Sequence, residues 1–247
     1  MAVLEHEGTY PIMYRSYAVP VGAGYRPGYL ARPDRAGRFP VVIVVPDLDG
    51  MTSFEKDVCR AFARHGLAAL TLDLYRNRSG DPIHDYQSLS DRQAMTDLDE
   101  VHEFLASDDI TWTSAEAMGM LGLDVGGRFA LATAAHRRWV RALALCYTPL
   151  TGDEEREIQV AELLEGLSVP VLGLYGAEDD LIDTGTVDEA QNRNTTGQWL
   201  LYEGAAHGFL NIDGDTFDVD AASDAAQRLV QFFLQTLPEA QPDETGF

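Results

Sequence analysis

The residue of greatest chemical interest in this 247-residue chain is Asp124, at the centre of the pentapeptide Gly122–Gly126 (GLDVG). The segment before it is apolar and typical of a buried strand, and the segment after it is typical of a helix. A strand-to-helix turn this sharp needs small residues two positions before and after its tip, and both positions hold glycine. Such a tip presents a nucleophile at a helix N-terminus, here a carboxylate in place of the usual serine or cysteine. Aspartate is also a good helix N-cap, so the pentapeptide alone leaves a structural role open.

Two further candidates, Asp179 and His207, follow Asp124 in the order nucleophile, acid, histidine. Asp179 comes three residues after the glycine that ends an apolar segment, and His207 follows a short strand predicted over residues 199–202. Because functional loops gather at the carboxyl ends of parallel strands, we expect the three side chains to converge, with His207 between the two carboxylates. Asp179 would then fix the tautomer of the imidazole and stabilise its protonated form. Either residue alone could be an ordinary loop residue, but their shared order favours a triad.

Strands and helices alternate along the chain, which is typical of parallel βαβ units in a doubly wound α/β fold. Apolar runs predict strands at residues 41–45, 67–72, 117–121, 142–146, 169–175 and 199–202. The spacing of apolar residues predicts helices at about 53–65, 91–106, 127–136, 158–164, 186–192 and 219–237, with an irregular stretch from 73 to about 90. We therefore expect one α/β domain over residues 1–238, with helices on both faces of a mostly parallel sheet, and a polar tail over 239–247.

The composition argues against several classes of protein. The chain has 40 acidic and 18 basic residues and a net charge of −22, whereas nucleic acids and anionic membrane surfaces bind basic proteins. No apolar run is long enough to span a bilayer, and the first residues lack the pattern of a signal peptide. The two cysteines, Cys59 and Cys146, fall in a predicted helix and a predicted strand and indicate buried thiols. We expect a cytoplasmic protein that acts on a small molecule without a metal or cofactor, in an oligomeric state that the sequence leaves open.

Six stretches, spread from residue 28 to the last predicted helix, carry a resemblance to a known family. They are Gly28–Pro33, Pro40–Gly50, Leu72–Tyr75, Gly122–Gly127, Leu174–Asp179 and Gly204–Phe209. Through them the chain resembles the dienelactone hydrolase family, a branch of the α/β-hydrolase superfamily that lacks a cap domain. The resemblance implies a cap-less α/β-hydrolase fold and a carboxymethylenebutenolidase-like hydrolase. The short connection from Tyr147 to Val169 likewise leaves too little chain for a helical cap.

The resemblance also implies roles for individual residues. The catalytic cysteine of the family falls on Asp124, its acid on Asp179 and its histidine on His207. The backbone N–H groups of Leu48 and Val125 fall where the family forms its oxyanion hole. The resemblance thus implies an elbow-His-Asp triad with an unusual residue at its nucleophile position.

Three more positions concern the substrate. Asp47 falls where the family often has a glutamate, and the resemblance implies that it faces Asp124, although it could instead be a turn residue pointing to solvent. Two carboxylates in a partly dry cleft rarely both ionise, so we expect one of them to have a raised pKa. The arginine that binds the carboxylate of the family's lactone substrate falls between Arg76 and Arg78. The resemblance therefore implies a small, anionic ester or lactone, although both arginines could equally be solvated loop residues.

The aspartate at position 124 leaves three functions open. Its attack on an ester carbonyl would give a mixed anhydride, which is higher in energy than the ester it replaces. Its attack on a saturated carbon would give an ordinary ester, so the first alternative is a C–halogen or epoxide hydrolase, although relatives with that chemistry carry a helical cap. The second alternative is a non-catalytic ligand-binding homologue. The presence of Asp179 and His207 argues against the latter, because a site without catalysis has no chemical need for them.

Overall fold

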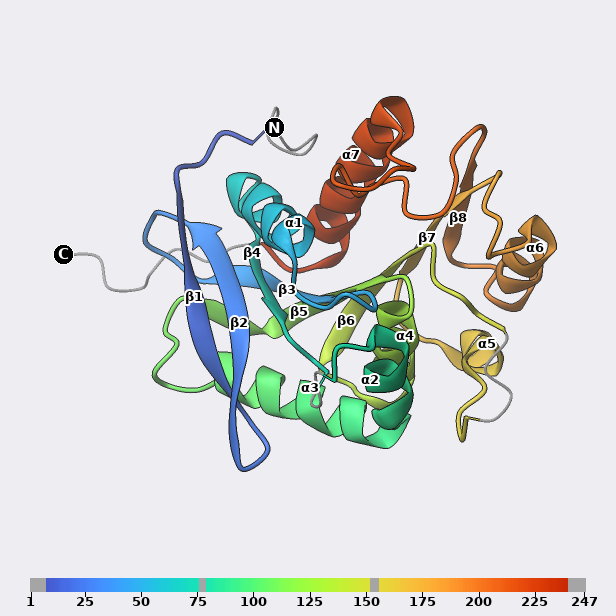
Figure 1. Ribbon diagram of the computed structural model, residues 1–247. Helices are drawn as coiled ribbons and strands as arrows, with labels where there is room; N and C mark the ends of the chain where they lie inside the picture. Colours follow the sequence, from blue (N-terminus) through green and yellow to red (C-terminus); the bar gives the residue numbers. More distant parts are fainter. Residues whose placement is uncertain (1–7, 76–78, 152–155, 240–247) are drawn as a thin grey trace.

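The protein is built on one eight-stranded sheet with the strand order β1-β2-β4-β3-β5-β6-β7-β8 (Figure 1). The computed structural model describes residues 8–75, 79–151 and 156–239. The strands are β1 (Ile12–Val21), β2 (Gly24–Pro33), β3 (Phe39–Val45), β4 (Ala68–Leu72), β5 (Thr113–Leu123), β6 (Val140–Cys146), β7 (Val171–Gly176) and β8 (Gln198–Tyr202). Neighbouring strands from β4 to β8 run parallel, whereas β1 pairs antiparallel with β2, and β2 with β4. The predicted doubly wound, mostly parallel α/β fold is confirmed.

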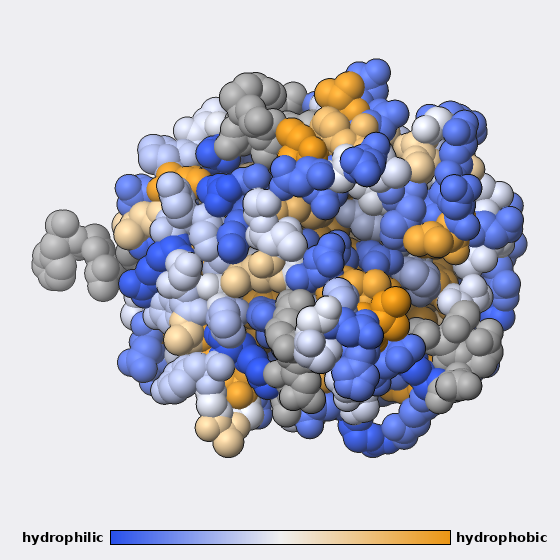
Figure 2. Space-filling view, viewed as in Figure 1, coloured by the Kyte–Doolittle hydropathy of each residue, from blue (hydrophilic) through white to orange (hydrophobic). Residues whose placement is uncertain are grey.

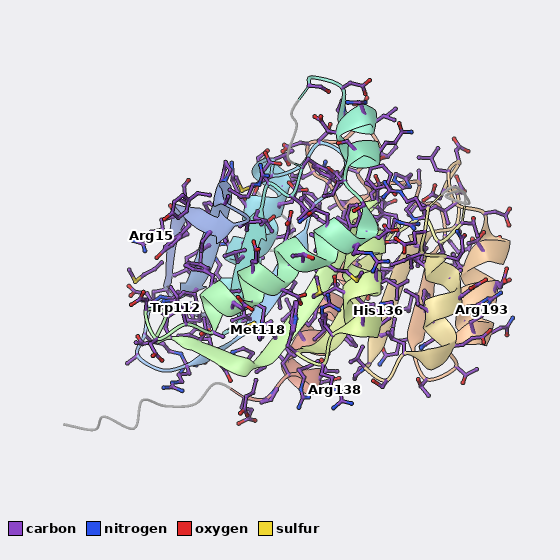
Figure 3. The ribbon with its side chains drawn as sticks, turned by 90° about the horizontal axis from the view of Figure 1, so that it is seen from below. Arg15, Trp112, Met118, His136, Arg138 and Arg193 are labelled. Atoms are coloured by element: carbon purple, nitrogen blue, oxygen red, sulfur yellow. The ribbon has the colours of Figure 1, made fainter. Side chains whose placement is uncertain are left out.

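Helices cover both faces of this sheet (Figure 1). They are α1 (Ser53–Arg64), α2 (Pro82–Ser88), α3 (Asp91–Leu105), α4 (Gly126–His136), α5 (Val160–Leu163), the 3₁₀ turn η2 (Leu164–Gly166), α6 (Thr184–Arg193) and α7 (Val219–Thr236). Helices α1 and α7 pack on one face. Helices α3 and α4 pack on the other, where Figure 3 shows them in front of the sheet and labels His136 at the end of α4. Among the described residues, α5 and η2 are the helical elements between β6 and β7, so this connection contains no helical cap there.

The central strand β3 divides the core into two layers. All seven of its residues are buried, and successive side chains point to opposite faces of the sheet. Ile43 and Val45 join the apolar cluster beneath α3 and α4, whereas Val42 and Val44 join the cluster beneath α1 and α7. The predicted burial of both cysteines is also confirmed, and both carry free thiols. This rigid centre holds the loops that follow the carboxyl ends of β3, β5, β6 and β7.

The first two strands were absent from the sequence prediction. In β1 most side chains are partly or fully exposed, because it forms an edge of the sheet, and its charged and aromatic residues give no apolar run. The prediction of an irregular stretch up to residue 90 was wrong in part, because it contains α2. This helix begins with Pro82 at its first position, and the Asp81 side chain accepts hydrogen bonds from the N–H groups of Ile83 and His84. Figure 3 shows α2 projecting beyond α3.

The face of the molecule in Figure 2 is mostly hydrophilic, with scattered apolar residues. Several acidic residues have local structural roles. Asp183 caps α6, and Asp218 caps α7 by accepting hydrogen bonds from two backbone N–H groups. Asp213 accepts a hydrogen bond from the hydroxyl of Ser53 at 2.7 Å. None of the helices in the described part of the chain is both long and apolar enough to cross a membrane.

Candidate active site

The backbone turns sharply at Asp124, between the end of β5 and the start of α4. Asp124 has a φ of 47°, in the left-handed region that residues with side chains seldom adopt. A Cβ atom on Gly122 would lie 2.3 Å from the Cα of Gly127, and one on Gly126 would lie 2.1 Å from the carbonyl oxygen of Pro46. Glycine is therefore required on both sides of the tip, as the sequence indicated, because the strand, the helix and the neighbouring loop approach too closely for a side chain.

The His207 ring lies between the two carboxylates that the sequence singled out. Its Nε2 is 3.2 Å from Oδ1 of Asp124, and its Nδ1 is 2.9 Å from Oδ2 of Asp179. The Asp179 side chain is fully buried, and its other oxygen accepts hydrogen bonds from the N–H groups of Leu181 and Ile182. The carboxylate that orients the imidazole is thus itself held from two sides. The three residues meet from the ends of β5, β7 and β8.

The surroundings of His207 favour its protonated form. Burial on its own would lower the pKa of the imidazole, but the hydrogen bond to Asp124 and the charges of Asp124 and Asp179 outweigh burial and raise the pKa. The imidazole therefore carries a proton at higher pH than a free histidine does. As a base, the imidazole is therefore available only at higher pH than a free histidine would be.

Asp47 lies in the turn after β3, where its Oδ1 accepts the backbone N–H of Asp49 at 2.9 Å. Burial, together with the nearby charges of Glu55, Asp49 and Asp124, raises the pKa of Asp47 to about 7. The expected carboxyl with a raised pKa is thus Asp47, and burial rather than Asp124 is its main cause. Of the three charges, that of Asp124 contributes least.

Glu55 is an acidic residue near this site that the sequence prediction missed. Its side chain is fully buried in the first turn of α1, and one carboxylate oxygen accepts hydrogen bonds from the N–H and the hydroxyl of Thr52. Its other oxygen, Oε1, is buried without a hydrogen-bond partner in the described part of the protein. Burial raises the pKa of Glu55. The Thr52-to-Glu55 spacing of a capping box was the signal that could have identified its position.

The predicted oxyanion-hole residues are Leu48, in the turn after β3, and Val125, which directly follows Asp124. Leu48 lines the cavity above the tip, and Val125 is the N-cap residue of α4. Within the described ranges, the backbone N–H of neither residue has an acceptor. The N-terminus of a helix also favours negative charge. Neither N–H group is thus committed to an acceptor within the described residues, as the predicted role would require.

A cavity of about 450 Å³ opens over Asp124. It is lined by Asp47, Leu48, Asp49, Asp81, Pro82, Ile83, Asp124, Tyr147, His207, Gly208, Asn211, Gly214 and Thr216. The start of α2 and the loop before α7 thus form walls that the sequence did not indicate. Four of the lining residues are aspartates, and none is a lysine or arginine. Arg76 and Arg78, expected to contact the substrate, lie outside the described residues.

Tyr147, directly after β6, is a further wall of this cavity that the sequence prediction did not include as a site residue. Its ring lies edge-on to the His207 ring, with 5.2 Å between the ring centroids, and 5.9 Å from the Phe209 ring. It also has a left-handed backbone, with a φ of 39°. The sequence could not predict this conformation, because tyrosine rarely adopts a left-handed backbone.

A family model for the dienelactone hydrolase family matches residues 27–237. The chain belongs to this family. Two relatives, from Escherichia coli (strain K12) and from Methylorubrum extorquens, are both named "Putative carboxymethylenebutenolidase". The first is 29% identical over 88% of this chain and 85% of its own length, and the second is 31% identical over 88% and 79%. A "Probable 2-oxo-3-(5-oxofuran-2-ylidene)propanoate lactonase" from Bradyrhizobium is 28% identical over 81% of this chain and 85% of the relative.

Solved structures agree with this assignment. The crystal structure of a "Putative Dienelactone Hydrolase" from Klebsiella pneumoniae superposes with a TM-score of 0.83 at 29% identity, over 91% of this chain and 99% of that one. A dienelactone hydrolase-like promiscuous phosphotriesterase from metagenomic libraries has a TM-score of 0.76 at 17% identity, over 92% and 99%, and at that identity it supports the fold alone. The protein is a dienelactone hydrolase-like hydrolase with an α/β-hydrolase fold.

Proposed function

We propose that this hydrolase cleaves a small ester or lactone in the cavity over Asp124, with Asp124, His207 and Asp179 acting as a unit. The observation that carries the proposal is the position of His207, 3.2 Å from one carboxylate and 2.9 Å from the other. Such an imidazole can pass a proton between Asp124, the leaving alcohol and water, while Asp179 holds its ring. A ligand-binding protein without catalysis would gain nothing from this arrangement.

In the proposed reaction, the substrate carbonyl oxygen accepts hydrogen bonds from the N–H groups of Leu48 and Val125. A carboxylate oxygen of Asp124 attacks the carbonyl carbon, the C–O bond to the leaving alcohol breaks, and protonated His207 gives that alcohol its proton. Water then attacks the resulting anhydride and loses a proton to His207, which releases the acid and restores Asp124. Because the anhydride is higher in energy than an ordinary ester, this route suits enol or aryl esters, whose leaving groups are stable.

The charge of the substrate is part of the proposal. The described lining of the cavity contains four aspartates and no cationic side chain apart from His207. A carboxylate-bearing substrate, as in the family, would therefore depend on Arg76 and Arg78. Exchanging each arginine for glutamine and comparing KM for an anionic and a neutral ester is the direct test of this assignment.

A second candidate function is the opening of a C–halogen or epoxide bond. The observation that favours it is the carboxylate at the tip of the elbow, because displacement at a saturated carbon leaves an ordinary ester on Asp124. His207 would then activate the water that hydrolyses this ester. The same residues serve both reactions, so the two functions are distinguished by the covalent intermediate on Asp124, which is an anhydride in ester cleavage and an alkyl ester in C–halogen or epoxide opening.

The deciding experiment is intact-mass measurement of His207→Ala protein after exposure to aryl esters, lactones, epoxides and haloacids. Without the imidazole the second step slows, and we expect Asp124 to retain an acyl group from an ester or an alkyl group from an epoxide or haloacid. Asp124→Asn is the matched control and should retain neither. Turnover of wild-type protein in ¹⁸O-labelled water is a complementary assay, because water that attacks an Asp124 ester leaves the label on the aspartate. Wild-type hydrolysis that survives Asp124→Asn unchanged would contradict both candidate functions.

A further inference from the structure

Two residues other than glycine have positive φ values in the described part of the chain, and both line the same cavity. They are Asp124, with a φ of 47°, and Tyr147, with a φ of 39°. Each directly follows one of the neighbouring parallel strands β5 and β6. A left-handed backbone is unfavourable for a residue with a side chain and persists where the surrounding structure enforces it, which is most common at functional sites. The conformation of Tyr147 therefore calls for the same functional explanation as that of Asp124.

The packing around Tyr147 fixes the direction of its ring. Its N–H donates to the carbonyl oxygen of Leu174 at 2.9 Å, and its ring contacts the rings of His207 and Phe209. Only 2% of the residue is exposed. Its presence in the cavity lining shows that part of this small exposed surface faces the space over Asp124. The side chain is thus held rigidly beside the reacting groups.

The hydroxyl of Tyr147 is an unused hydrogen-bond donor. It has no hydrogen-bond partner among the residues that the structure describes. Burial, together with the nearby charges of Asp47, Glu55 and Asp124, raises the pKa of Tyr147 well above its usual value, so the hydroxyl keeps its proton. The hydroxyl of Thr216, by contrast, already donates to the carbonyl oxygen of His207 at 2.6 Å.

A bound substrate would supply the missing acceptor. Most of the other side-chain oxygens around the cavity belong to aspartates, and these accept rather than donate when ionised. We propose that Tyr147 contacts the substrate and donates its phenolic O–H to a substrate oxygen that becomes more negative during hydrolysis. The proton stays on Tyr147 throughout, so this residue stabilises charge and transfers nothing. The inference deepens the proposed function and rests on it.

The test compares Tyr147→Phe with Tyr202→Phe, a matched control. The Tyr202 ring also packs on Phe209, at 5.1 Å, but its hydroxyl donates to Asp224 at 2.9 Å and lies outside the cavity lining. We expect Tyr147→Phe to lower kcat/KM for an aryl ester about 100- to 1000-fold, as loss of one donor to a developing charge does. Its urea midpoint should not fall, because the hydroxyl it loses has no internal partner. Tyr202→Phe should show the opposite pattern, with unchanged kcat/KM and a lower urea midpoint.

The pH dependence of kcat/KM separates a contact with substrate from an effect through His207. If Tyr147 contacts substrate, Tyr147→Phe lowers kcat/KM by the same factor at every pH and leaves the pH of the inflection unchanged. Tyr147→Phe activity within about twofold of wild type, or a shifted inflection, overturns the inference. Inactivity of the wild-type protein on the entire substrate panel would instead contradict the proposed function, so the two failures are distinguishable.

Discussion

Replacing Asp47 with asparagine should stabilise the protein above about pH 7 and leave its stability nearly unchanged near pH 4. The pKa of Asp47 rises from 3.8 to about 7 in the folded protein, mainly through burial. A carboxyl with a raised pKa binds more protons in the folded than in the unfolded state, so stability falls as pH rises between these two values. Above about pH 7 the whole cost of the buried charge is present.

The size of this cost follows from the shift. One pKa unit corresponds to about 1.36 kcal/mol, so a rise of about three units sets a ceiling of about 4 kcal/mol. Asp47 lines an open cavity, and water there screens part of the charge, which brings the expected gain to about 2 kcal/mol. Asparagine keeps the side-chain oxygen that accepts the N–H of Asp49, so the turn after β3 is preserved.

Urea unfolding of wild type and Asp47→Asn at about pH 4 and about pH 8 measures this difference. Asp49→Asn is the control, because it removes the same charge two residues away from an exposed side chain, and it should change stability by less than about 0.5 kcal/mol. An Asp47→Asn protein no more stable than wild type at pH 8, or stabilised equally at both pH values, would refute the reasoning. In that case the folded protein would solvate the Asp47 carboxylate well.

Three further predictions concern the elbow and its histidine. The carboxylate neighbours raise the pKa of His207 above 6.5, and the proposed acyl transfer uses the protonated imidazole, so kcat/KM should fall as pH rises through an inflection above that value, as measured in a pH–rate profile. Gly126→Ala should lower the free energy of unfolding by about 2 to 4 kcal/mol, because its Cβ would lie 2.1 Å from the carbonyl oxygen of Pro46. Gly24→Ala, with nothing within 4 Å of the added Cβ, is the control, and equal unfolding midpoints for the two variants would contradict the steric argument. Asp124→Cys should gain activity on aryl esters over wild type, since a thiol beside His207 at the N-terminus of α4 is readily deprotonated, and a hydrolysis assay that shows no gain counts against an acyl-transfer site.

The central strands could be predicted from the sequence because a strand buried on both faces of the sheet consists of an unbroken run of apolar residues. Strand β3 consists of buried residues along its whole length, and such a run has few other interpretations. The hairpin of β1 and β2 gives no such apolar run, because the edge strand β1 is mostly exposed, as is the first part of β2, and both strands place arginine and tyrosine beside apolar residues. Helix α2 is short, and its signal resides in the cap at Asp81 rather than in an apolar face.

The candidate site likewise contains residues that the sequence could predict and residues that only the structure reveals. Asp124, Asp179 and His207 were predictable because a glycine-flanked turn and two strand ends mark their positions. The contribution of Tyr147 was not, because it depends on a backbone conformation and on ring contacts that only the assembled strands create. The burial of Glu55 beneath the site is likewise a product of packing rather than of local sequence.

The left-handed backbone at Asp124 has a consequence for how such a site can change over generations. Asparagine and aspartate tolerate this conformation better than serine or cysteine, because their short polar side chains interact favourably with the adjacent backbone. A mutation from cysteine to aspartate at the tip therefore relieves strain while it removes the thiol, and the reverse mutation restores a strong nucleophile at some cost in stability. Folding imposes no barrier to losing the thiol. Only selection for a thiol nucleophile would therefore keep cysteine at the tip of this elbow. Without that selection, the left-handed backbone favours aspartate.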